Sequence, residues 1–143
     1  MSALSPTRNF EEITVGESLP ELVIDLTPTR IISTAIASRD YQDVHHDRDL
    51  AQQKGSKDIF MNILTTNGYV GRFVTDWAGP EALLTKVDIR LGAPNYPGDT
   101  MTLTGTVTTK ENGVVSVDVV GRNGLGNHVT GRVDLKLPRQ GAA

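Results

Sequence analysis

The sequence predicts an α+β domain in which an antiparallel sheet wraps around one long central helix. Residues 62–77 form the longest stretch whose apolar residues recur at three- and four-residue spacing, which is typical of a helix. Four stretches that alternate apolar and polar residues follow, which is typical of half-buried strands. At 143 residues the chain has room for one such domain with a core, so we expect a single domain over residues 1–143.

Polar residues dominate the beginning of the chain, and we expect residues 1–17 to be mobile or loosely packed. Leu22, Ile24 and Leu26 then occupy every second position, which predicts a short first strand. Residues 138–143, at the other end, are expected to be flexible as well.

A short helix is predicted after this strand. Thr27 is suited to the N-cap and Pro28 to the first helical position, where its missing N–H costs nothing. The helix leads directly to Asp40. Its apolar stripe consists of Ile31, Ile32, Ala35 and Ile36.

The long helix is predicted to end at Gly79-Pro80. Gly68 and Gly71 lie inside it, where glycine costs about 1 kcal/mol relative to alanine. We therefore expect another segment of backbone to approach the helix closely at these glycines. The apolar side of this helix consists of Ile63, Leu64, Val70, Phe73, Val74 and Trp77.

Four antiparallel strands are predicted around 87–91, 101–107, 115–119 and 129–137. Their connections carry turn residues, with Pro-Gly in 96–99, the hairpin pair Asn112-Gly113 and a glycine-rich loop over 123–127. A sheet of this kind curled around a helix is the hot-dog fold. Because its edge strand lacks a neighbour, we expect at least a dimer.

Composition excludes several classes of function. The net charge of −3 and the absence of a basic run argue against a nucleic-acid surface. The chain has no cysteine, so it has neither a disulfide framework nor a thiolate nucleophile. We also find no secretion signal and no apolar run long enough for a membrane span, and we expect a cytoplasmic protein that does not bind a membrane.

Residues 40–47 have the highest concentration of side chains that can act as acids or bases, with two of the chain's three histidines among three aspartates. A loop can bring Asp40 and His45, five positions apart, to one point. A carboxylate beside an imidazole is a general acid/base pair. The residues alone leave a second interpretation open, because aspartate and histidine in a polar loop are commonly just solvated.

Three further residues are candidates for the functional site, and the sequence leaves their roles open. Asn62 is either a helix N-cap or a group that positions substrate. Asp47 either supports the loop and orients His45 or is exposed to solvent. A different enzyme class would use His45, Asp47 and distant His128 as the two-histidine, one-carboxylate set of a non-haem iron oxygenase.

The pattern of Asp40, His45, Asp47, Ala51 and Gly55 resembles the motif of the MaoC-like enoyl-CoA hydratases. The resemblance covers residues 20–137 and includes a Pro-Gly-Asp-Thr turn at 97–100. More narrowly, three segments resemble the small MaoC-like subunit of actinobacterial steroid side-chain hydratases, and these are residues 39–49, 55–60 and 75–80.

The resemblance implies hydration of a 2,3-unsaturated acyl-CoA thioester, with Asp40 and His45 as the catalytic pair and with neither a metal nor a cofactor. The acyl group implied is a steroid side chain. The implied partner is a second MaoC-like chain, in a heterodimer or heterotetramer, with a homodimer as the alternative. An acyl-CoA-binding subunit without catalysis and an acyl-CoA thioesterase remain alternative functions.

Two positions depart from the family's pattern. Gln42-Asp43 replaces Asn-Pro, so other contacts must shape the loop. Asn62-Ile63 replaces a His-Gly pair whose glycine N–H binds the thioester oxygen. Any residue except proline keeps this N–H, so we expect the N–H of Ile63 to donate to the thioester oxygen in place of the glycine. Asn62, the residue before it, is expected to help position the substrate.

Overall fold

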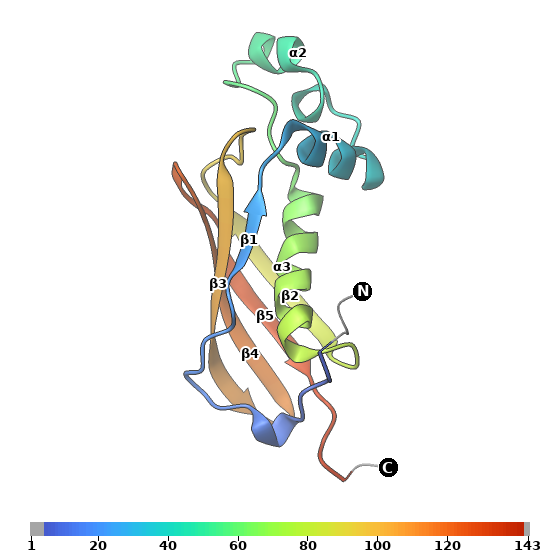
Figure 1. Cartoon of the computed structure of the whole chain (residues 1–143), viewed down its shortest axis with the longest axis vertical. Coiled ribbons are helices and arrows are strands. Elements are labelled where there is room, and N and C mark those ends of the chain that lie inside the picture. The colour runs from blue at the N-terminus through green and yellow to red at the C-terminus, as the bar shows by residue number, and fades with distance from the viewer. Residues whose placement is uncertain (1–4, 142–143) are drawn as a thin grey trace.

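The computed structural model describes residues 5–141. A five-stranded antiparallel sheet curls around helix α3, and helices α1 and α2 lie beyond one end of the sheet (Figure 1). This arrangement confirms the predicted hot-dog architecture. The elements are η1 (Phe10–Glu12), β1 (Leu22–Asp25), α1 (Pro28–Ala37), η2 (Asp43–His45), α2 (Arg48–Gln53), α3 (Ile63–Ala78), β2 (Leu83–Leu91), β3 (Thr100–Glu111), β4 (Val114–Asn123) and β5 (Gly126–Lys136).

The strands lie in the order β1-β3-β4-β5-β2, so β2 pairs with the last strand and forms one edge. Asn112 and Gly113 both have positive φ, at 52° and 78°, as a two-residue hairpin between β3 and β4 requires. Pairing of β4 with β5 continues to Asn123 and Gly126, so this turn is tighter than the predicted five-residue loop.

One face of α3 packs into the curl of the sheet. Val70, Phe73 and Val74 are at most 2% exposed. They meet inward-facing strand residues such as Val117 and Val133, which are completely buried. The apolar periodicity of the helix therefore forms the core, as predicted, because the sheet removes that face from water.

The predicted reason for the glycines in α3 is wrong. Gly68 has open space where a side chain would lie, and a Cβ at Gly71 would be 3.7 Å from the nearest atom, in Leu84. Gly68 is exposed to solvent. At the start of the helix, Ile63 and Leu64 are 48% and 49% exposed, although both fall in the predicted apolar stripe.

Residues 5–17 make defined contacts and are not loosely packed, contrary to the prediction. Ile13 is 3% exposed, and the N–H of Gly16 donates to the carbonyl of Val107 in β3 at 2.8 Å. The ends of the chain at residues 1–4 and 142–143, which fall in the segments predicted to be flexible, lie outside the described residues. Within residues 5–141, no helix is both long and apolar enough to cross a membrane.

Candidate functional site

Asp40 is placed by the end of α1. Thr27 caps the start of this helix, as predicted, by accepting a hydrogen bond from the N–H of Arg30 at 3.1 Å. At the other end Arg39 adopts a left-handed conformation with φ 57°, and the N–H of Asp40 donates to the carbonyl of Ala35 at 2.9 Å. This turn ends the helix. The Asp40 side chain, which follows the turn, is 17% exposed.

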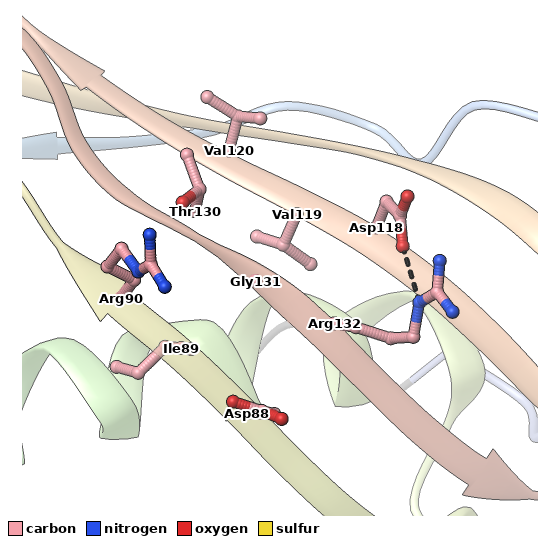
Figure 2. Close-up of a pocket in the computed structure, with 9 residues that line it drawn as sticks. All are labelled: Asp88, Ile89, Arg90, Asp118, Val119, Val120, Thr130, Gly131 and Arg132. Atoms are coloured by element: carbon pink, nitrogen blue, oxygen red, sulfur yellow. Dashed lines mark hydrogen bonds and ion pairs between the residues drawn. The ribbon is translucent and has the colours of Figure 1, made fainter.

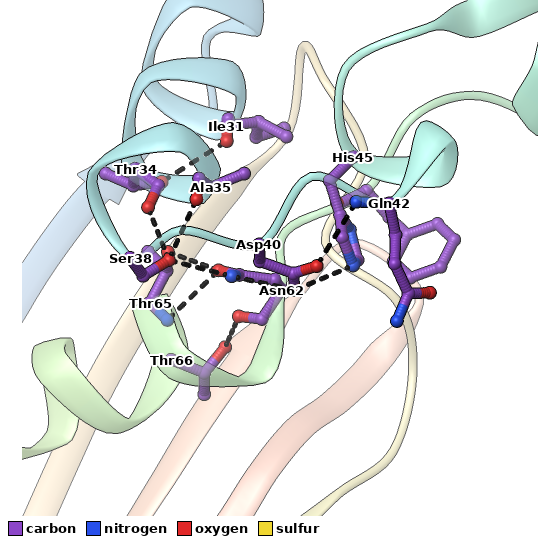
Figure 3. A network of polar contacts seen from close by, with 11 residues as sticks. Ile31, Thr34, Ala35, Ser38, Asp40, Gln42, His45, Asn62, Thr65 and Thr66 are labelled. Atoms are coloured by element: carbon purple, nitrogen blue, oxygen red, sulfur yellow. Dashed lines mark hydrogen bonds and ion pairs between the residues drawn. The ribbon is translucent and has the colours of Figure 1, made fainter.

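His45 is buried and lies against the half-buried Asp40. The Nε2 atom of His45 lies 3.3 Å from Oδ2 of Asp40. Figure 3 shows the two side chains pointing toward one another. Nδ1–H of His45 donates to the carbonyl of Phe60 at 2.7 Å, and the two rings pack edge to face. This backbone contact sets the tautomer, so that Nε2 of the neutral ring is the nitrogen that faces Asp40.

Contacts to α2 shape the loop between these two residues. Lys54, which caps the end of α2, forms an ion pair with Asp43 at 2.9 Å, and its hydrogen bond lowers the pKa of that carboxyl group. The carboxylate of Asp47 accepts the N–H of Leu50 at 3.0 Å and thereby caps the start of α2. The structure thus places Asp47 at the helix cap, and the carbonyl of Phe60 holds the His45 ring.

Asn62 is 1% exposed and lies at the start of α3. Its Oδ1 accepts the N–H of Thr65 at 3.1 Å, which makes it the N-cap. Its Nδ2 donates to Oδ2 of Asp40 at 3.1 Å and to Oγ of Ser38 at 2.9 Å. The contacts to Asp40 and Ser38 carry no signal in the sequence, because they join segments more than twenty residues apart.

The first turn of α3 offers unpaired backbone donors. Asn62 satisfies the N–H groups of Thr65 and Thr66. The N–H groups of Ile63 and Leu64 find no acceptor within residues 5–141. The positive end of the helix dipole adds to these donors, so this end of α3 favours an anionic oxygen.

A pocket of about 300 Å³ lies at this end of α3. Asp40 and His45 lie in its wall together with Ile63, the first residue of α3. The other lining residues are Gln42, Phe60, Met61, Leu91, Gly92, Pro94 and His128. The pocket therefore combines an acid/base pair with the amino end of the central helix.

A larger hollow of about 510 Å³ lies over β2, β4 and β5, on the face of the sheet that does not hold α3 (Figure 2). Its charged side chains are exposed, and Arg132 forms an ion pair with Asp118 at 2.8 Å. None of the predicted site residues lines it. We therefore place the candidate active site in the smaller pocket.

The alternative iron set is wrong. Among residues 5–141, no three His, Cys, Asp or Glu side chains gather as a metal site requires. His128 uses both ring nitrogens within the protein, since Nδ1–H donates to the carbonyl of Ala93 at 2.7 Å and the hydroxyl of Thr66 donates to Nε2 at 2.8 Å. His128 is instead a buried wall residue of the pocket, a role that the sequence analysis missed.

Burial lowers the pKa of His128 below its ordinary value, so the folded protein holds this ring neutral. Below about pH 6.5 this histidine binds a proton in the unfolded chain but not in the folded chain. The free energy of unfolding therefore falls as the pH falls. His128→Gln removes this titration along with two hydrogen bonds. The stability advantage of the wild type over His128→Gln should therefore shrink between pH 7.5 and 5 in urea denaturation curves.

His46→Gln is the control for this experiment because it removes an exposed histidine that neighbours the site. A wild-type advantage over His128→Gln that stayed constant across this range would contradict the expected neutral, buried ring.

Comparison with known proteins identifies the family of the chain. Residues 11–128 match the model of the MaoC like domain. The chain is 58% identical over 123 residues to the 3-oxo-4,17-pregnadiene-20-carboxyl-CoA hydratase beta subunit of Mycobacterium tuberculosis, and the match covers 86% of this chain and 95% of that protein.

Two solved structures illustrate the shared fold. A chain of the ChsH1-ChsH2 complex from Mycobacterium tuberculosis superposes with a TM-score of 0.85 and 57% identity, over 87% of this chain and 98% of that one. The R-hydratase PhaJ1 from Pseudomonas aeruginosa superposes with a TM-score of 0.83 at 19% identity, over 92% and 86% of the two chains. The chain therefore belongs to the MaoC-like domain family.

Proposed function

We propose that this chain is the catalytic small subunit of a hydratase that adds water to a 2,3-unsaturated acyl-CoA thioester. The observation that carries the proposal is the pair of Asp40 and His45, 3.3 Å apart in the wall of the pocket. The beginning of α3 lies in the same pocket, through Ile63. Addition of water to an enoyl thioester needs a base, a proton donor and a site for negative charge, and these groups supply all three.

The pair is suited to hold one water molecule. Nδ1 of His45 carries a proton toward the carbonyl of Phe60, so Nε2 is the ring nitrogen that can exchange a proton beside Oδ2 of Asp40. One water molecule in contact with both groups can give up a proton to the pair and present its lone pair to C3 of the substrate. The C3–O bond then forms as the pair takes one water proton, and the pair delivers a proton to C2.

Two interacting groups titrate as a unit, so the base and the acid are roles of the pair. Negative charge collects on the thioester oxygen while C3 is attacked. The N–H group of Ile63, at the positive end of α3 and in the wall of the pocket, is the proposed donor to that oxygen.

The proposed substrate is a steroid side-chain enoyl-CoA. This is supported by the relative from Mycobacterium tuberculosis, a 3-oxo-4,17-pregnadiene-20-carboxyl-CoA hydratase beta subunit that is 58% identical. We place the reaction in the cytoplasm, and both this location and the acyl-CoA substrate are predictions.

The proposed partner is a second MaoC-like subunit, as the similarity to a chain of the ChsH1-ChsH2 complex suggests. Strand β2 forms an edge of the sheet, with Val87 and Leu91 37% and 38% exposed. Leu91 and the half-exposed Ile63 also line the pocket. A subunit that covered this edge would therefore complete the pocket wall and enlarge the apolar surface for a steroid.

The hydration reaction is tested by the ultraviolet absorbance of the conjugated enoyl thioester. We expect this absorbance to fall when the chain, co-expressed with its partner subunit, is added to a steroid side-chain enoyl-CoA. A thiol reagent run in parallel detects free CoA, which a thioesterase releases and a hydratase does not. Unchanged absorbance with both steroid and linear enoyl-CoA substrates, in the presence of the partner, would refute the proposal.

A further inference from the structure

The side-chain amide of Asn62 makes two sets of hydrogen bonds, one through its oxygen and one through its nitrogen. Its Oδ1 accepts hydrogen bonds from the N–H and the hydroxyl of Thr65, in the first turn of α3. Its two N–H bonds point to Oδ2 of Asp40 at 3.1 Å and to Oγ of Ser38 at 2.9 Å (Figure 3). The side chain thus joins the cap of the central helix to the carboxylate of the candidate acid/base pair.

Only one orientation of this amide satisfies its neighbours. If its oxygen and nitrogen exchanged places, the oxygen would face the Asp40 carboxylate and the NH₂ group would face the N–H of Thr65. Both contacts would be repulsive. The helix cap therefore fixes the direction in which Asn62 presents its donor to Asp40.

We propose that Asn62 is a positioning residue for Asp40, which holds the carboxylate against His45. The donor meets Oδ2, the same oxygen that faces Nε2 of His45. Within residues 5–141 the other hydrogen bond to this carboxylate comes from the N–H of Gln42, at 3.4 Å. This inference rests on the proposed hydration, because it assigns Asn62 a part in the same reaction.

The charges around Asp40 are few. His45 of η2 is the titratable group in contact with it. The ends of α1 and α3, which pack on its other sides, contribute the uncharged side chains of Ser38 and Asn62. The carboxylate of Asp40 therefore lies between the imidazole of His45 on one side and the amide donor of Asn62 on the other.

Substitutions at position 62 separate the two tasks of the side chain. Asn62→Ser and Asn62→Asp keep a side-chain oxygen that can cap α3, but serine is too short to reach Asp40 and aspartate offers no donor. Asn62→Ala removes the cap and the donor together. A residue that served only as a helix cap would tolerate the first two changes and would lose stability with the third.

We expect Asn62→Ser to lower kcat by roughly 10- to 100-fold with little change in KM, because a misplaced catalytic group costs about that much. Asn62→Asp should cost more near neutral pH. It should also move the acid limb of the kcat/KM profile to higher pH, because two adjacent carboxylates resist ionising together. Wild-type kcat and an unchanged pH profile in both variants would overturn the inference and leave Asn62 as a cap.

A double-mutant cycle on stability tests the contact without turnover. Asp40→Ala, Asn62→Ser and the double variant are compared by urea denaturation, and the two single losses should fail to add because the residues touch. Coupling without any hydratase activity in the wild type would refute the proposed function and retain the contact. Normal hydration by the wild type with additive stability losses would refute this inference alone.

Discussion

Asp40→Asn and His45→Gln, each made in the chain co-expressed with its partner subunit, should lower kcat for hydration by roughly 10²- to 10⁴-fold. The Asp40→Asn variant would keep an acceptor for the Nδ2 donor of Asn62 but would lose the charge that activates water. The His45→Gln variant would lose the ring nitrogen that lies 3.3 Å from the Asp40 carboxylate. Steady-state loss of enoyl absorbance, measured on each purified complex, gives both rates.

His46→Gln is the matched control for this pair of variants. It alters the neighbouring histidine, which is exposed, and should leave the rate unchanged. Full activity in both Asp40→Asn and His45→Gln would remove the catalytic assignment. The chain would then be a binding subunit whose partner carries the acid/base pair.

Phe73→Ala should lower the free energy of unfolding by about 3–5 kcal/mol, the usual cost of deleting a buried aromatic ring. Phe73 is 2% exposed and is the largest of the fully buried side chains. Its ring lies over Gly105 of β3, where a Cβ would come within 2.8 Å of Cε1. The ring therefore anchors α3, and with it the helix end at the site, to the sheet.

Urea denaturation of the wild type and Phe73→Ala gives this difference directly. Phe73→Leu is the comparison variant, because it keeps most of the apolar volume and should lose much less stability. A loss below about 1 kcal/mol in Phe73→Ala would mean that α3 is held to the sheet in another way.

Much of the fold could be predicted from local patterns. The alternation in β3 to β5, the cap at Thr27 and the hairpin pair Asn112-Gly113 each act over a few residues, and the structure has them where the sequence indicated. The glycines of α3 show where such reasoning fails. A glycine in a helix signals a missing side chain, but the sequence does not say whether backbone or open space lies beside it.

The sequence by itself predicted the pairing of Asp40 with His45, because a loop of five residues can bring them together. It also determined the core face of α3, since that periodicity belongs to a single helix. Only the tertiary structure decided what surrounds the pair. The carbonyl of Phe60, the amide of Asn62 and the ring of His128 reach the site from separate segments. Their contacts depend on how the sheet closes around α3, and no local pattern encodes that closure.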